Sequence, residues 1–188
     1  MTEPFQQWGL DIIGEIFPHS LKKNSYILTT TNYFTRWTEV VLLKQVNDEE
    51  VIKFLQHNII SQFGILVSLV FNNVTYFSSL NIYDFALQYG IMLKHSSNYY
   101  PQGNGLVESI NKNLICIIMK TIYFEQWNWN CTLMNALWAD RVTPKPSLNT
   151  SPYFLVYGKE AILPPNIYFS AFQLSQEFSA KWSYRKNE

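Results

Sequence analysis

The spacing of apolar residues changes part-way along this chain, and that change limits the folds it can adopt. Three short apolar runs with the composition of β-strands come first, separated by turn-prone segments: Phe5–Ile13, Tyr26–Thr31 and Trp37–Leu43. From Asn47 onward the apolar residues recur at helical spacing, and strand-like runs then alternate with helical stretches. Parallel crossover connections in an α/β layer accommodate that order, so we expect an α/β fold.

Capping and breaking residues place the later elements. Asn47 and Glu50 predict a capping box at the start of a helix that Gly64 ends. The further elements expected are strands at Val67–Phe71 and Ile91–His95, helices at Ile82–Tyr89 and 105–123, and a last helix ending before Pro144. That last helix has an apolar face made of Trp127, Cys131, Met134, Leu137 and Trp138. This order fits a ribonuclease-H-like fold, with a mixed five-stranded sheet flanked by helices.

Composition indicates a folded protein of one domain. The chain has 188 residues, of which 47% are apolar and 15% charged. We expect residues 4–167 to form the domain, with a Pro-rich and aromatic segment beyond Asn149 and a frayed tail over 168–188. Lysine plus arginine balances aspartate plus glutamate at 14 each, so any nucleic-acid contact needs locally clustered cations.

The cysteines and the pattern of apolar residues indicate the cellular compartment of the protein. Cys116 and Cys131 lie in helix-like sequence without a zinc-ligand spacing, and lone cysteines of this kind are usually buried small side chains. They indicate a reducing compartment. The start of the chain lacks a signal-peptide pattern, and the apolar stretch Leu114–Met119 is too short to cross a bilayer. We therefore expect a soluble, intracellular protein.

Two carboxylates and an amide form the candidate site. Asp11 interrupts an apolar strand, Asn72 follows the fourth strand, and Glu108 opens a helix after a Gly-rich loop, with residues 73–107 between the last two. Burying an unpartnered carboxylate is costly, which favours a functional role for Asp11. Three acids at these positions would hold two Mg²⁺ ions for phosphodiester chemistry. Asn72 offers only a neutral oxygen, so we expect weakened metal capture and a severe loss of activity.

Several residues near Glu108 are candidates for nucleic-acid contact. Asn111 and Lys112 follow it at helical spacing, so they can share its exposed face. The alternative is an ordinary solvated Glu–Lys pair. In the preceding loop the candidates are Tyr100, Gln102 and Asn104. Loop aromatics often only pack, and that alternative stays open for the tyrosine.

Five segments of the chain, which include most of these candidate residues, resemble a known protein family. The matching segments are Trp8–Gly14, Tyr26–Trp37, Phe63–Ile65, His95–Glu108 and Tyr153–Ala161. They resemble the integrase catalytic core of gypsy-class LTR retrotransposons, especially the plant type. The resemblance implies a ribonuclease-H-like fold, Mg²⁺ or Mn²⁺, and the joining of element DNA ends to target DNA, with Asp11 and Glu108 as first and third metal-binding acids. It also implies a nuclear location and a possible homodimer.

The chain departs from the family pattern at the second acid. The family motif begins with Asp and has Gly two residues later, whereas this chain has Asn72 and Val74 and keeps Phe77. Asn32 also replaces a common Asp. The zinc-binding and C-terminal modules of such integrases are not seen, so we expect an isolated, catalytically impaired core. Two alternatives remain: a working integrase that tolerates Asn72 with Mn²⁺, and a non-enzymatic DNA- or protein-binding module.

Overall fold

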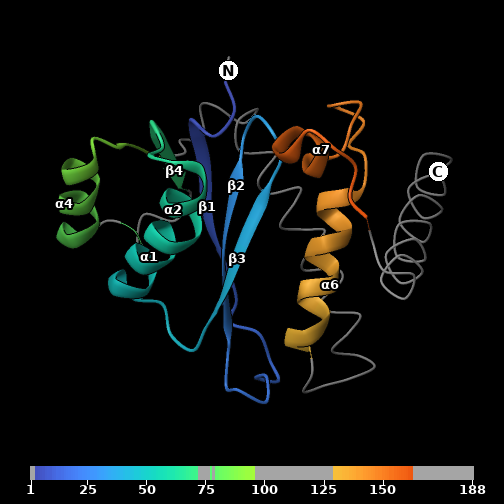
Figure 1. The fold of residues 1–188 in the computed structure, drawn as a ribbon. Helices are drawn as coiled ribbons and strands as arrows, with labels where there is room; N and C mark the ends of the chain where they lie inside the picture. The colour runs from blue at the N-terminus through green and yellow to red at the C-terminus, as the bar shows by residue number, and fades with distance from the viewer. Residues whose placement is uncertain (1–2, 72–76, 78, 96–128, 163–188) are drawn as a thin grey trace, which may run out of the picture.

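The computed structural model describes residues 3–71, 77, 79–95 and 129–162, and these contain one five-stranded sheet (Figure 1). Its strands are β1 (Gln7–Ile13), β2 (Tyr26–Asn32), β3 (Thr38–Leu43), β4 (Ser68–Phe71) and β5 (Met92–His95). The spatial order is β3-β2-β1-β4-β5. The first three strands pair antiparallel, whereas β4 is parallel to β1 and to β5. The mixed five-stranded sheet predicted from the sequence is confirmed.

The described helices cover both faces of this sheet. They are α1 (Asp48–Phe54), η1 (Leu55–Ile60), α2 (Ser61–Phe63), α4 (Leu80–Tyr89), α6 (Trp129–Val142) and α7 (Pro152–Tyr157). Figure 1 shows α1, α2 and α4 on one side of the sheet and α6 and α7 on the other. In the described part of the chain, no helix has the length and apolarity needed to cross a bilayer.

The helix that begins after Asn47 differs in two details from the sequence prediction. The Asn47 side chain accepts a hydrogen bond from the Glu50 amide at 2.9 Å, as expected of an N-cap. The Glu50 carboxylate lies 3.8 Å from the Lys53 ammonium instead of returning to the cap, so only half of the capping box forms. The middle of the helix, Leu55–Ile60, is π-helical rather than α-helical. Gly64 ends it with a positive φ of 83°, as predicted.

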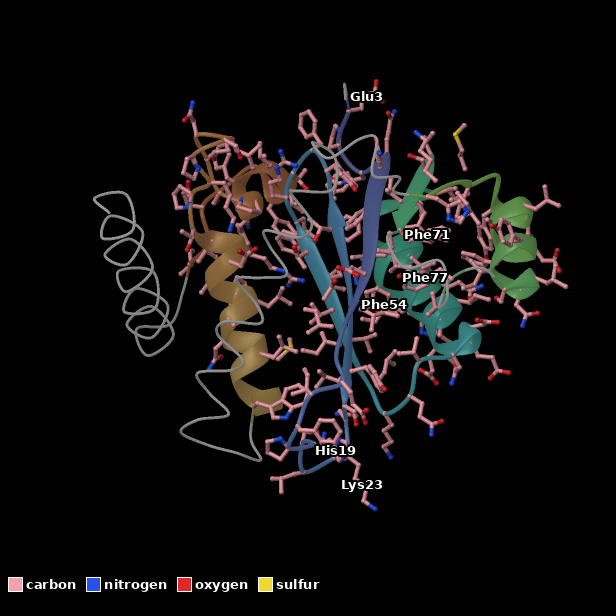
Figure 2. The ribbon with its side chains drawn as sticks, turned by 180° about the vertical axis from the view of Figure 1, so that it is seen from behind. Glu3, His19, Lys23, Phe54, Phe71 and Phe77 are labelled. Carbon is pink, nitrogen blue, oxygen red and sulfur yellow. The ribbon has the colours of Figure 1, made fainter. Side chains whose placement is uncertain are left out.

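One face of the sheet carries the larger core. Trp8 and Leu10 of β1 pack there with buried residues of α1, η1 and α4. Figure 2 labels Phe54, Phe71 and Phe77, which belong to this core and come from α1, β4 and the segment before α4. Because side chains alternate along a strand, Asp11 and Ile13 belong to the opposite face.

The opposite face packs against α6. Ile13 and Ile27 form a smaller core with Trp129 and Leu133, and the Trp129 indole donates to the carbonyl of Pro18 at 3.1 Å. The predicted apolar face of this helix is wrong at Met134, which is 53% exposed. Leu137 is buried as predicted, and Ala136 and Ala139, which were not part of the predicted face, are buried beside it. The side chains of Trp127 and Cys131 lie outside the described residues.

The C-terminal part of the described chain returns to the sheet edge. Ser151 caps α7 by accepting from the Phe154 amide at 3.1 Å, and Pro152 occupies its first turn. The ring of Tyr153 stacks on that of Trp138 with centroids 5.8 Å apart. This helix forms where the sequence showed only a Pro-rich aromatic segment, although its Ser-Pro start and its closing Gly158 are recognised helix signals.

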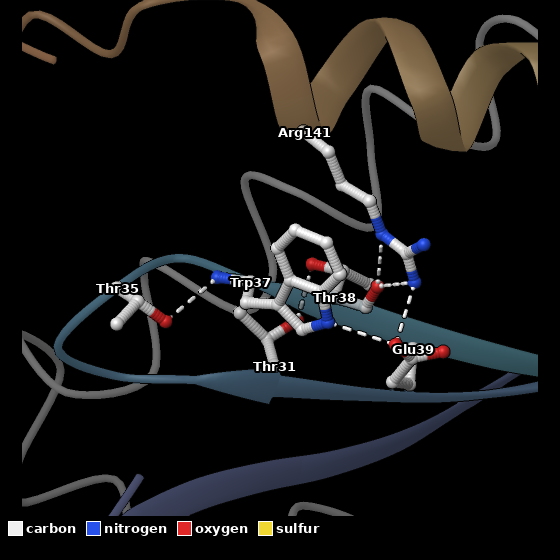
Figure 3. Close-up of polar contacts among 6 residues, drawn as sticks. All are labelled: Thr31, Thr35, Trp37, Thr38, Glu39 and Arg141. Carbon is white, nitrogen blue, oxygen red and sulfur yellow. Dashed lines mark hydrogen bonds and ion pairs between the residues drawn. The ribbon is translucent and has the colours of Figure 1, made fainter. Parts of the chain in front are cut away.

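Arg141 fastens α6 to the edge strand β3 (Figure 3). Its guanidinium donates to the carbonyl of Thr38 and pairs with Glu39 Oε1 at 2.8 Å. The Trp37 indole donates to the same carboxylate oxygen at 2.8 Å. The side chains of Arg141 and Glu39 are 13% and 11% exposed. The ion pair is thus largely removed from water and ties two distant parts of the chain together.

Candidate active site

Asp11 is held in the centre of the sheet. It pairs with Thr29 of β2 and is half-buried, between Leu10 and Ile12. Its Oδ1 accepts a hydrogen bond from the amide of Ile12 at 2.9 Å, and the Thr29 hydroxyl donates to its carbonyl at 3.3 Å. The backbone that carries this carboxylate is therefore fixed by ladder and side-chain hydrogen bonds together.

The ladder between β1 and β4 ends next to Asp11. Its last described pair is Leu10 with Phe71, and the residues that follow these two in the chain are Asp11 and Asn72. On the other side of β4, Phe71 pairs with His95 of β5. The carboxyl ends of β4 and β5 thus lie in the row beside Asp11, and α/β sheets usually bind ligands at the carboxyl ends of their parallel strands.

The remaining predicted site residues lie outside the described part of the chain. They are Asn72, Tyr100, Gln102, Asn104, Glu108, Asn111 and Lys112. Their convergence with Asp11 stays a prediction. Within residues 3–71, 77, 79–95 and 129–162, no group of three His, Cys, Asp or Glu side chains is arranged to hold a metal ion. Asp11 supplies the carboxylate oxygen that Mg²⁺ prefers, so its donor chemistry fits such a site.

The charge of Asp11 reaches a buried tyrosine. Tyr33, which is 5% exposed, follows the end of β2. Burial raises the pKa of Tyr33 from 10.0 to about 12, the charge of Arg36 acts in the opposite direction, and that of Asp11 raises it further. Burial likewise lowers the pKa of Arg36, which donates to the carbonyl of Tyr33 at 2.7 Å. Asp11 therefore acts electrostatically on a side chain that is shielded from water.

Asn32 has a structural role at the end of β2. Its side chain is fully buried, and its amide nitrogen donates to the carbonyl of Gln7 at 3.1 Å. Its oxygen accepts from the amides of Phe34 and Thr35 and from the Thr35 hydroxyl at 2.9 to 3.1 Å. These contacts use both ends of the amide, and they fix the turn into β3.

Sequence comparison finds retroviral polyproteins. The Gag-Pol polyprotein of avian reticuloendotheliosis virus is 28% identical over 164 residues, or 87% of this chain and 14% of the polyprotein. The Pol polyprotein of radiation murine leukemia virus (strain Kaplan) is 29% identical over 174 residues, or 92% of this chain and 29% of that protein. The chain thus spans less than a third of either relative. No family model matches it.

Structure comparison finds integrases. A chain of the simian T-cell lymphotropic virus intasome in complex with PP2A regulatory subunit B56 gamma has a TM-score of 0.68 and 20% identity, covering 86% of this chain and 57% of that one. The HTLV-2 integrase catalytic core domain in complex with magnesium (trimeric form) has a TM-score of 0.62 and 21% identity, covering 83% and 99%. This chain has the fold of a retroviral-type integrase core. Asp11 lies on the first strand of this sheet.

Proposed function

We propose that this chain is a catalytically impaired integrase core derived from a gypsy-class LTR retrotransposon of the plant type, a kind of domain that joins element DNA ends to target DNA in the nucleus. In this proposal Asp11 and Glu108 are the metal-binding acids and Asn72 replaces the second acid. A homodimer and contacts with DNA through Tyr100, Gln102, Asn104, Asn111 and Lys112 belong to the same proposal.

The observation that carries the proposal is the place of Asp11 in the sheet. A half-buried carboxylate lies on the central strand of an integrase-type fold, beside the row in which the β1–β4 ladder ends. Removing a carboxylate even partly from water costs free energy, so a carboxylate on a central strand needs a compensating role. A site for a cation and phosphate oxygens gives that carboxylate a use.

The chemistry follows from the donor groups. Bound Mg²⁺ or Mn²⁺ would neutralise charge on the phosphodiester and activate the attacking oxygen. Asp11 would hold its carboxylate towards that site from a rigid strand, and Glu108 would contribute a second carboxylate. Asn72 would contribute a neutral carbonyl oxygen, and the missing unit charge would weaken cation capture. We therefore propose that the core is catalytically impaired.

A strand-transfer assay with Asn72→Asp tests this proposal. The unmodified chain should show little Mg²⁺-dependent joining of element DNA ends, and Asn72→Asp should restore part of it. Asn73→Asp is the matched control, because it adds the same charge one residue away. Asp11→Asn in the Asn72→Asp background should abolish the restored joining. Ordinary joining rates for the unmodified chain would overturn the impairment, and no joining by Asn72→Asp would overturn the catalytic assignment.

Metal titration by calorimetry distinguishes an impaired core from a working one. Capture of two Mn²⁺ ions by the unmodified chain would favour an integrase that tolerates Asn72. Weak capture that Asn72→Asp strengthens would favour impairment. A chain that binds DNA or a protein without metal and without joining, even as Asn72→Asp, would be a binding module with an integrase fold.

A further inference from the structure

The connection between β1 and β2 folds into a compact turn that displays lysines. The Asn24 amide donates to the Ser20 hydroxyl, and the Ser20 amide donates to the Asn24 carbonyl, both at 3.1 Å. The Lys23 amide donates to the carbonyl of Ser20 at 2.7 Å. The Ser25 hydroxyl lies 2.7 Å from His19 Nδ1. Ser20, Asn24 and Ser25 are buried, whereas Lys23 is exposed. The turn therefore has buried polar residues on its inside and the exposed Lys23 on its surface.

This turn forms one wall of an open cleft of about 940 Å³. The antiparallel pairing of Tyr26 with Leu43 brings the start of β2 beside the end of β3, so Lys44 reaches the same cleft. Asn47 and Glu50 of the α1 region form another part of the lining. Figure 2 shows His19 and Lys23 together at the end of the molecule remote from Glu3.

The charge of the cleft is basic. Lys23 and Lys44 line it with His19, against one carboxylate, Glu50. That carboxylate lies 3.8 Å from the Lys53 ammonium, which offsets part of its charge. Within the described residues neither cleft lysine belongs to an ion pair. The largely buried cation Arg141, by contrast, pairs with Glu39.

The cleft lies within reach of a duplex placed at Asp11. Asp11 pairs with Thr29, and the cleft begins at Ser25, four residues along β2. At about 3.3 Å per residue this separation is roughly 13 Å. Phosphates along one DNA strand are about 3.4 Å apart in axial projection, so the separation corresponds to roughly four nucleotides. A DNA backbone of a few nucleotides is therefore long enough to span this separation.

We propose that the cleft between the β1–β2 turn and the end of β3 binds phosphates of a DNA backbone through Lys23 and Lys44, with His19 as an additional donor. This inference rests on the proposed function and names a second place at which the core holds its substrate. The chain has no net charge, so binding to DNA depends on a local gathering of cations. Lysines act here as point charges, which suits recognition independent of sequence.

Salt-dependent binding of the purified chain to a short DNA duplex of arbitrary sequence tests the proposal. Each phosphate contact contributes about 0.9 to the slope of log affinity against log salt. The double variant Lys23→Gln/Lys44→Gln should therefore lower the slope by about 2, and Lys23→Arg/Lys44→Arg should retain it. Lys159→Gln, at an exposed lysine beyond α7, is the matched control and should leave the slope unchanged. Thermal unfolding should be similar for all variants, because the substituted lysines are exposed.

The outcomes separate this site from the proposed function. Salt-dependent binding with the same slope in the glutamine double variant would overturn the cleft and leave the catalytic proposal standing. No salt-dependent binding by the unmodified chain would overturn both the cleft and the DNA contacts proposed for the core. Loss of slope in the glutamine variant, with retention in the arginine and Lys159→Gln variants, would support the cleft even if Asn72→Asp joined no DNA ends.

Discussion

The guanidinium carbon of Arg141 lies 4.1 Å from the ring centroid of Trp37, so a cation from α6 covers an aromatic face at the edge of the sheet (Figure 3). Arg141 also pairs with Glu39, and burial lowers the pKa of Arg141 while that carboxylate opposes the effect. A guanidinium suits this position because its planar fork binds the Thr38 carbonyl and the carboxylate while its face stacks on the ring.

Arg141→Ala should lower the free energy of unfolding by about 3–5 kcal/mol, because Glu39 would keep a largely buried charge without its cation. The double variant Arg141→Met/Glu39→Gln removes both charges and should lose less than the single variant. Urea unfolding measures both quantities, and Lys159→Ala controls for loss of an exposed cation. An equal or larger loss in the double variant would contradict a charge-burial cost.

Asn32→Asp should destabilise the fold by about 1–3 kcal/mol at neutral pH. The substituted carboxylate cannot donate to the carbonyl of Gln7, and it places an oxygen against that carbonyl in a fully buried position. Asn32→Ala removes all four hydrogen bonds and should cost at least as much. Thermal unfolding gives the comparison. An Asn32→Asp chain as stable as the parent would show that the amide donor contributes nothing.

The sheet could be predicted because its signals are local. Each strand is a short apolar run bounded by turn-forming residues, and the helix ends at Gly64 and Gly90 are marked by single residues. The partnership of Arg141 with Glu39 has no such signal, because it joins elements about a hundred residues apart in the chain and depends on how α6 lies against the edge of the sheet.

The apolar periodicity of the sequence predicted a helix here but did not predict that its middle is π-helical. Val51, Leu55, Ile59 and Phe63 repeat every four residues, and such a repeat drifts around an α-helix of 3.6 residues per turn. The wider turn of Leu55–Ile60 reduces that drift and keeps Leu55 and Ile59 buried.

Of the candidate site, only Asp11 lies in the described residues, so the meeting of Asp11 with Glu108 remains a prediction.

Asn47→Ala should lower the free energy of unfolding by about 1 kcal/mol, because the Glu50 amide would lose its side-chain acceptor. Glu50→Ala should have a much smaller effect, since the Glu50 side chain faces Lys53 across 3.8 Å at an exposed position. Chemical unfolding of the two variants decides whether the second half of the capping box exists in solution. A Glu50→Ala loss as large as that of Asn47→Ala would show that it does.

Alkaline pH should destabilise the fold through Tyr33. The folded-state pKa of Tyr33, about 12, lies above its ordinary value of 10.0. Below pH 10 the phenol is neutral in both the folded and the unfolded chain, and its contribution to the free energy of unfolding is fully present. Between pH 10 and 12 the unfolded chain loses its proton while the folded chain keeps it, so stability falls as pH rises. The loss approaches about 2–3 kcal/mol at the upper end of this window.

Tyr33→Phe removes this ionisable group, so its free energy of unfolding should fall less steeply than that of the parent across the same window. Urea unfolding at a series of pH values from neutrality upward measures the difference in slope, which separates Tyr33 from other groups that titrate in both chains. Tyr157→Phe is the matched control, because Tyr157 is 50% exposed whereas Tyr33 is 5% exposed. Equal slopes for Tyr33→Phe and the parent would mean that burial does not keep the Tyr33 phenol protonated.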